Sequence, residues 1–149
     1  MILRSARIDE VPGLSDLCFR SKAVWGYDKA FMEACRRELS FAPQDIEQTH
    51  IAVAEEDGRT LGVVQVKVSS GDAELLKLFV EPDALRKGTG SMLFAWAAEV
   101  SRRGGASRIV IEADPGAVPF YRKVGARGAG NAPSSSIPGR LLPRLTFEI

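Results

Sequence analysis

Two spacings of hydrophobic residues alternate along this chain, and together they predict a mixed α/β fold. Apolar residues recur every three or four positions, the period of a helix with one buried face, in four stretches. The predicted helices cover residues 9–23, 28–39, 89–103 and 117–124. Between them, short alternating or continuous apolar runs are typical of strands. The predicted strands are 3–8, the two runs that flank a turn at 56–59, and 74–80, 108–113 and 142–148.

Local signals mark where several of these elements begin and end. Asp9 and Asp28 are of the residue type that caps helix N-termini, and Pro12 would lie in the first turn after Asp9. Asp-Gly in the turn at 56–59 favours a hairpin, and Gly104 would end the longest helix. The predicted buried face of that helix consists of Met92, Leu93, Trp96, Ala97 and Val100. The resulting order, β-α-α-β-β-β-α-β-α-β-β, predicts a central mixed sheet of six or seven strands flanked by about four helices.

Length and composition narrow the class of protein further. A chain of 149 residues, 45% of them hydrophobic and 26% charged, is expected to form a single domain over residues 1–149. Its 20 basic and 19 acidic residues leave a net charge of +1, which offers no general attraction for nucleic acid or an acidic membrane. The longest apolar run, 92–98, is too short to cross a bilayer, and residues 1–10 do not resemble a secretory signal. Because two cysteines cannot form a disulfide framework, we expect a cytoplasmic protein.

A glycine-rich turn joins the strand at 74–80 to the longest helix. It consists of Leu85, Arg86, Lys87, Gly88, Thr89, Gly90 and Ser91. The first amides of a helix lack intrahelical partners, and the helix dipole favours an anion there. The two glycines would let the backbone approach a phosphate, while Arg86 and Lys87 add positive charge. The turn therefore predicts a phosphate-binding site, with a tight turn that binds no ligand as the alternative.

Two other phosphate-binding motifs do not fit this turn. The chain lacks the Gly-x-x-x-x-Gly-Lys-Ser/Thr sequence of a P-loop. The dinucleotide-binding fingerprint requires a third glycine where Leu93 stands, and its turn follows the strand directly, whereas residues 81–87 intervene here. These differences argue against a nicotinamide or flavin dinucleotide.

A second motif follows the next strand, and with the glycine turn it resembles the GNAT family of N-acetyltransferases. The family's strand, (Gln/Arg)-x-x-Gly-x-(Gly/Ala) turn and helix are similar to residues 76–103. Its next motif, Asn-x-x-Ala-x-x-Phe-Tyr-x-Lys-x-Gly-Phe, has the spacing of Asp114, Ala117, Phe120, Tyr121, Lys123 and Gly125. The chain departs from the family at Leu85, Asp114 and Ala126, which replace Gln or Arg, Asn and an aromatic residue. The resemblance covers nearly the whole chain and implies a GNAT-like fold.

The resemblance also implies that the chain binds acetyl-CoA as a co-substrate and transfers the acetyl group to an amine. In the family, strands four and five splay apart, and the opened strand binds the pantetheine arm through its backbone. The implied cofactor-binding residues are Leu78, Phe79, Val80, Arg86, Lys87, Gly88, Thr89, Gly90, Ser91, Asp114 and Tyr121.

Two residues are candidates for proton transfer in this reaction. Tyr121 matches the family's general acid, whose phenol would protonate the departing thiolate, and the alternative is an aromatic ring that only packs. Glu74 opens the motif strand, where some relatives carry a carboxylate base that acts through water; Glu81 is the second candidate. Direct attack by the amine needs no protein nucleophile. One histidine and two distant cysteines make a metal site unexpected.

The family binds acceptors between its first two helices, the motif strand and the C-terminal hairpin. Trp25 and Tyr27 lie at the predicted junction of the first two helices, and Arg140 lies in an irregular loop, 133–140, that could bind a carboxylate. These three are the expected substrate-binding residues; the alternatives are aromatics that cap the core and a mobile surface loop. We expect a small-molecule amine as the acceptor. A protein N-terminus or lysine, a domain that binds or senses acyl-CoA without transfer, and a homodimer are left open.

Overall fold

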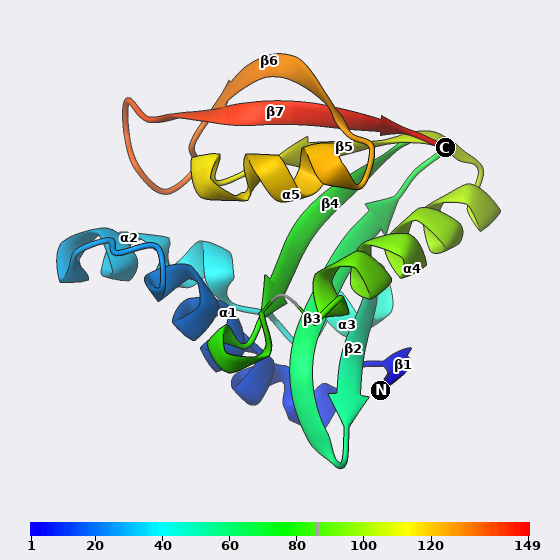
Figure 1. Ribbon diagram of the computed structural model, residues 1–149, viewed down its shortest axis with the longest axis horizontal. Coiled ribbons are helices and arrows are strands. Elements are labelled where there is room, and N and C mark those ends of the chain that lie inside the picture. Colours follow the sequence, from blue (N-terminus) through cyan, green and yellow to red (C-terminus); the bar gives the residue numbers. More distant parts are fainter. Residues whose placement is uncertain (86) are drawn as a thin grey trace.

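The computed structural model describes residues 1–85 and 87–149, which form a seven-stranded sheet in the order β1-β2-β3-β4-β5-β7-β6 (Figure 1). The strands are β1 (Ile2–Ser5), β2 (His50–Glu56), β3 (Arg59–Val68), β4 (Gly71–Val80), β5 (Ala106–Glu112), β6 (Arg127–Pro133) and β7 (Leu141–Glu148). The helices are α1 (Val11–Ala23), α2 (Lys29–Leu39), α3 (Asp45–Gln48), α4 (Thr89–Arg103) and α5 (Val118–Lys123). The β4–β5 pair is parallel and the other pairs are antiparallel, so the predicted mixed α/β sheet is confirmed.

The two faces of the sheet are covered by different helices, because successive side chains of a strand point to opposite faces. On β3, Val64 and Val66 belong to the core under α4 and α5, which contains Leu93 and Tyr121. Val63 of the same strand belongs to the other core, under α1 and α2. Among the described helices, none combines the length and the apolarity that a membrane crossing requires.

The sheet opens between β4 and β5. These strands pair from Gly71 and Ala106 as far as Leu75 and Ile111, while β4 continues beside β3 to Val80. At this point Gln65 and Val66 of β3 pair with Lys77 and Leu75, so Leu76 is an extra residue in β4. Such a β-bulge bends the strand that carries it and increases its twist. Figure 1 shows β4 running down with β3 and β2 while β5, β7 and β6 lie across the top of the molecule.

Several predicted boundaries are confirmed and others are wrong, among them the start of the motif strand, which lies at Gly71 rather than Glu74. Helix α4 has the predicted bounds, and Asp28 caps α2 by accepting a hydrogen bond of 2.8 Å from the Phe31 amide. Asp9 does not cap a helix; it lies inside a 3₁₀ turn, Ile8–Glu10, that precedes α1. The first strand ends at Ser5 rather than residue 8, because its pairing with β2 ends there.

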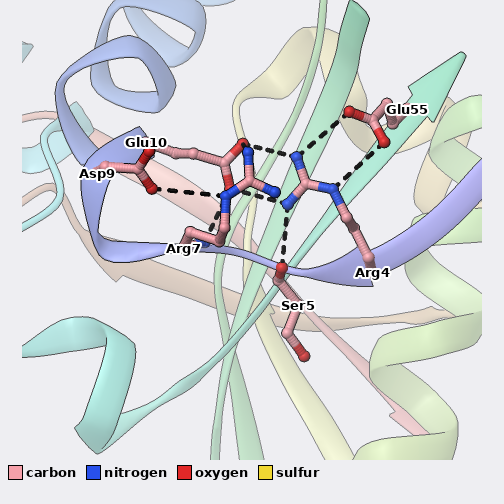
Figure 2. Close-up of polar contacts among 6 residues, drawn as sticks. All are labelled: Arg4, Ser5, Arg7, Asp9, Glu10 and Glu55. Atoms are coloured by element: carbon pink, nitrogen blue, oxygen red, sulfur yellow. Dashed lines mark hydrogen bonds and ion pairs between the residues drawn. The ribbon is translucent and has the colours of Figure 1, made fainter. Parts of the chain in front are cut away.

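Arg4 joins the first strand to the start of the first helical segment (Figure 2). Its guanidinium donates to both carboxylate oxygens of Glu10, at 2.8 and 2.7 Å, and to Glu55 of β2 at 3.4 Å. The Arg7 amide donates to Glu10 as well, at 2.8 Å. These hydrogen bonds, from Arg4 above all, lower the pKa of Glu10 to about 2. The Glu10 side chain is only 14% exposed, so water screens this pair less than a surface pair.

This network predicts a pH dependence of stability. Because the folded-state pKa of Glu10 lies below its unfolded value, the stabilisation is present above about pH 4.5 and is lost as the pH falls through about 2. One pKa unit is worth ~1.4 kcal/mol, and after an allowance for solvent screening we expect about 2 kcal/mol. The Arg4→Met variant should lack this part of the acid dependence in denaturant unfolding measured across that range.

Arg103→Met is the matched control. Arg103 is 75% exposed and pairs with Glu99 within α4, so its loss should change the free energy of unfolding by about 0–1 kcal/mol. The role given to Arg4 would be contradicted by equal losses of unfolding free energy in the two variants. It would also be contradicted if the stability of Arg4→Met depended on acidic pH as that of the wild type does.

Candidate active site

The N-terminus of α4 presents backbone donors at the end of β4. Gly88 is the N-cap residue, with a φ of 81° in the left-handed region, and it has no side chain with which to cap the helix. Among the described residues, a Cβ atom at Gly88 would have nothing within 4 Å, and both Gly88 and Lys87 are exposed. Ser91 in the first turn is exposed as well, so a ligand can approach the start of the helix at the positive end of its dipole, an arrangement that suits a phosphate. A groove of about 490 Å³ adjoins this turn at Ser91 and continues between α4 and β7.

The second glycine of the turn has a different role from the first. A Cβ atom at Gly90 would lie 3.2 Å from the Phe120 ring, so this glycine lets α5 pack close to the start of α4. Thr89 is buried, and its hydroxyl lies 3.6 Å from the sulfur of Met1, so its side chain is engaged within the protein. Arg86, also expected to bind the cofactor, lies outside the described residues.

The opened edge of β4 lies next to this turn. Leu78, Phe79 and Val80 pair with β3 on one side and have no partner on β5 in the described part of the chain. Val80 Cγ2 lies 3.9 Å from the Cβ position of Gly90, so the opened edge and the α4 turn are in contact. A linear ligand could therefore bind phosphate groups at the turn and hydrogen-bond along the strand.

Tyr121 lies in α5, in the core beneath α4. Its ring packs edge-to-face on Phe94 and Phe120, with centroid distances of 6.1 and 5.1 Å. Burial raises the pKa of the Tyr121 phenol above its ordinary value, so the phenol stays protonated at neutral pH. Among the described residues, no group hydrogen-bonds to this hydroxyl. A protonated phenol without a protein partner is suited to donate its proton to a ligand.

The two carboxylates considered as bases lie in different surroundings. Glu74 is exposed on β4, beside Val110 of β5, one residue before the β4–β5 pairing ends. Its neighbours along the strand, Ala73 and Leu75, face α4, so Glu74 lies on the face that α1 and α2 cover. Glu81 is buried and forms an ion pair with Arg20 of α1, so its carboxylate is already engaged.

A polar cluster joins three segments on the α1–α2 side of the opening. Tyr27 donates a hydrogen bond of 2.5 Å to Asp114 Oδ2, and Arg140 donates one of 2.8 Å to the Tyr27 hydroxyl. Lys22 Nζ lies 3.4 Å from the same Asp114 oxygen, and Asp114 Oδ1 accepts from the Gly116 amide at 3.0 Å. We call Lys22, Tyr27, Asp114 and Arg140 the polar cluster.

The pKa values in the polar cluster agree with these hydrogen bonds. Partial burial alone would raise the pKa of Asp114, but hydrogen bonds from Tyr27 and the Gly116 amide, with Lys22 nearby, outweigh it and lower this pKa. Burial and the bond to Asp114 raise the pKa of Tyr27. Asp114 is therefore an ionised acceptor and Tyr27 a protonated donor at neutral pH.

Trp25 and the β6–β7 loop enclose the polar cluster. Trp25 is 51% exposed, and its ring covers Gly116, where a Cβ atom would lie 2.9 Å from Trp25 Cε3. The loop at 134–140 is tied to α2, because Ser136 hydrogen-bonds to Glu38 and Ile137 packs on the α1–α2 core. The structure thus brings Trp25, Tyr27 and Arg140 to one side of the opening.

Sequence reasoning missed Lys22, Phe31 and Lys77. Lys22 looks like any surface charge of an amphipathic helix, and Phe31 looks like a core residue. Lys77 lies on β4, where burial lowers its pKa, and its Nζ donates to Gln65 at 3.1 Å over the Phe41 ring. Gln65 belongs to β3, so Lys77 points away from the opening. Only the contacts across the fold distinguish these residues from others of their type.

The described residues contain no group of three or more His, Cys, Asp or Glu side chains that could hold a metal ion. Cys18 and Cys35 are free and buried in the α1–α2 core. Burial raises the pKa of the Cys18 thiol to about 12.

Comparison with known proteins identifies similar domains. Residues 18–132 match the family model described as an acetyltransferase (GNAT) domain. Among curated protein sequences, none matches the chain at a significant level.

Solved structures share the fold at low sequence identity. PaiA N-acetyltransferase from Thermoplasma acidophilum, in complex with coenzyme A, has 18% identity and a TM-score of 0.82, covering 99% of this chain and 98% of its own. The ribosomal-protein-S18-alanine N-acetyltransferase from Escherichia coli has 18% identity and a TM-score of 0.72, with 99% and 93% covered. N-acetylglutamate synthase from Neisseria gonorrhoeae, complexed with coenzyme A and N-acetyl-glutamate, has 20% identity and a TM-score of 0.72, with 99% and 34% covered.

Proposed function

The chain belongs to the GNAT family of acetyltransferases, and from this premise we propose that it transfers an acetyl group from acetyl-CoA to a primary amine of a small molecule. The amine attacks directly, with both substrates bound together. The observation that supports this most is the opening between β4 and β5, which has the α4 turn at one end and lies next to the helix that carries Tyr121. The acetyltransferase domain spans residues 1–149, and we place the activity in the cytoplasm.

We assign the binding of acetyl-CoA to backbone groups first. The amides of Gly88, Thr89, Gly90 and Ser91 would bind the pyrophosphate, with Lys87 adding charge. The amides and carbonyls of Leu78, Phe79 and Val80 would pair with the pantetheine arm. Acetyl-CoA supplies a thioester as the acyl donor, and no metal is needed. The residues fit this co-substrate because the α4 turn is exposed and the β4 edge lacks a partner on β5 in the described part of the chain.

The chemical step needs three contributions from the protein. A backbone N–H near Phe79 or Val80 would stabilise the negative charge that develops on the thioester oxygen. Tyr121 would hold the proton that the departing thiolate takes up. Glu74 would accept the amine proton through water, since it lies on the face where the acceptor enters.

The identity of the acceptor amine is defined less closely than that of the acetyl donor. Similar structures include a ribosomal-protein-S18-alanine N-acetyltransferase and an N-acetylglutamate synthase complexed with N-acetyl-glutamate, so likeness of fold does not choose between a protein and a small amine. The polar cluster favours a small molecule, because its three charged side chains are each less than 20% exposed and are more easily reached by a compact ligand than by a folded protein surface. The two carboxylate oxygens of Asp114 already accept hydrogen bonds from Tyr27 and the Gly116 amide. Asp114 would therefore bind the pantetheine arm only in addition to these two groups.

Acetyl-CoA should raise the melting temperature of the protein. At 100 times its Kd, a ligand that binds only the folded state stabilises by ~2.7 kcal/mol, which corresponds to roughly 5–10 °C for a chain of this size. NADH is the control ligand, because the turn does not fit a dinucleotide. Thermal unfolding with each ligand would measure the shift. Equal shifts, or none with millimolar acetyl-CoA, would contradict the proposed donor.

An amine-library screen that measures free CoA then tests the transfer. Release with small amines supports the proposal. Release only with peptides that carry a free N-terminus or lysine would make the acceptor a protein. Binding of acetyl-CoA without release for any amine would indicate a sensing domain.

A further inference from the structure

Two cationic side chains meet at a single carboxylate on the acceptor side of the opening. Lys22 Nζ lies 3.4 Å and Arg140 Nη2 lies 3.6 Å from the same Asp114 oxygen. We propose that Lys22 and Arg140 form a binding site for an anionic group of the amine acceptor, most suitably a carboxylate. This inference rests on the proposed function, because it names the class of amine that the same site takes.

Of the acidic side chains near Lys22 and Arg140, only Asp114 lies within 4 Å of either cation in the described part of the chain, while Glu38 hydrogen-bonds to Ser136. Lys22 and Arg140 contribute two positive charges and Asp114 one negative charge, while their side chains are 14%, 19% and 12% exposed. Two cations that are largely removed from water therefore share one directly paired carboxylate, and a charge removed from water is unfavourable unless it is closely paired. An anionic ligand group would give the two cations a second anionic partner in direct contact.

The geometry of the ion pairs also leaves donors for a ligand. Charge-assisted N–H···O bonds prefer about 2.7–2.9 Å, so the contacts of Lys22 and Arg140 with Asp114, at 3.4 and 3.6 Å, are loose. Arg140 donates one side-chain hydrogen bond within the described chain, from Nη2 to Tyr27. A guanidinium has five N–H donors in a planar fork, which matches the two oxygens of a carboxylate.

Two stacked aromatic rings hold the cations in place. Tyr27 and Phe31 stack with centroids 4.0 Å apart and an interplanar angle of 13°. The Arg140 guanidinium carbon lies 4.8 Å from the Phe31 centroid, and Lys22 Nζ lies 5.5 Å from that of Tyr27. Such contacts fix both cations before a ligand arrives, and a preorganised site loses less entropy on binding.

The position of the site relates it to the reaction. Asp114 follows the end of β5, the strand that borders the opening, and Trp25 covers the next turn at Gly116. An acceptor whose anionic group replaces Asp114 at the two cations would extend from there toward β4. Asp114 then acts as an internal carboxylate that holds Lys22 and Arg140 until the acceptor binds.

A purely structural ion-pair network is the alternative explanation. It would tie α1, the β5–α5 connection and the β6–β7 loop together without binding a ligand. The two explanations differ for Asp114→Asn, which removes the internal competitor. A ligand site predicts several-fold tighter binding of anionic amines by this variant, whereas a structural network predicts lower stability and no gain in binding.

The experiment compares pairs of amines that differ only in the anionic group. Calorimetric titration of the CoA-saturated protein uses amino acids against their amides, and phosphoethanolamine against ethanolamine to distinguish phosphate from carboxylate. We expect amino acids to bind more tightly than their amides. Lys22→Met and Arg140→Met should each weaken amino acid binding roughly ten- to a hundredfold, the size of one charge-assisted hydrogen bond, and spare the amides.

Arg36→Met is the matched control, since Arg36 lies on α2, pairs with Glu33 and is 51% exposed. It removes the same charge and should leave both classes of amine unaffected. Arg140→Lys keeps the charge without the planar fork and should give an intermediate loss, which tests the site even if a methionine variant is unstable.

Three results would overturn the inference: amides that bind as tightly as amino acids, variants that lose both classes equally, or no binding of any carboxylate at millimolar concentration. Release of CoA is measured on the same samples. Selective binding without release would reject the proposed transfer and keep the anion site. Release of CoA with neutral amines, without tighter binding of anionic amines, would reject the anion site and keep the proposed transfer.

Discussion

Replacing Tyr121 with phenylalanine is expected to lower the turnover number ~10²–10⁴-fold, the usual contribution of a general acid. Only the hydroxyl is lost, because the ring would keep its edge-to-face contacts with Phe94 and Phe120. The affinity for acetyl-CoA and the melting temperature should therefore stay close to the wild-type values. The measurement is kcat with a saturating acceptor, under conditions where chemistry limits the rate.

Tyr27→Phe is the matched control, because the chain has two tyrosines and the same atom is removed from each. Tyr27 hydrogen-bonds to Asp114 and Arg140, so its loss should act mainly on the KM of the acceptor. If Tyr121→Phe retains wild-type turnover, Tyr121 is a packing residue and the proton comes from elsewhere.

Replacing Gly88 with valine should weaken acetyl-CoA binding by roughly ten- to a hundredfold. A β-branched residue strongly disfavours the left-handed conformation, with φ at 81°, that Gly88 adopts. The turn would shift, and the loss of one charge-assisted hydrogen bond from an amide to a phosphate costs ~1.5–3 kcal/mol. Calorimetric titration with acetyl-CoA would measure the change.

Gly58→Val separates this effect from backbone strain alone. Gly58 lies in the β2–β3 hairpin with a φ of 79°, and a Cβ atom there would also have nothing within 4 Å in the part of the chain that the structure describes. Both variants should lose similar stability, of about 1–2 kcal/mol. Only Gly88→Val should lose affinity; a Gly88→Val protein that folds and binds normally would contradict the phosphate site.

The sequence alone determined the elements whose signals are local. Helix α4 begins and ends where predicted because glycines lie at both of its ends, and Asp28 caps α2 through its own side chain. The β2–β3 hairpin has the expected turn because Asp57 and Gly58 both take positive φ values. In each case the residues that decide the boundary are neighbours in the chain.

The structure was needed where distant segments compete for a residue. Met92 was expected in the buried face of α4 but is 38% exposed, and Phe94 is buried instead. Phe94 packs on Tyr121 and Phe147, which belong to α5 and β7, so later segments cover a side of the helix that a local pattern leaves open. Asp9 does not cap a helix for a similar reason, because its neighbour Glu10 accepts a hydrogen bond from Arg4 of the first strand.

The candidate site likewise has parts that the sequence predicts and a part that only the tertiary structure reveals. The turn at Gly88, the position of Tyr121 and the opened edge at Leu78–Val80 follow from motifs and from the family resemblance, because each lies within one contiguous segment. The polar cluster required the tertiary structure, since it joins Lys22, Asp114 and Arg140 from three separate segments. Sequence shows that these residues are charged, but only the fold brings two cations to one carboxylate, and this sharing of a single direct partner is the physical basis for an anionic acceptor.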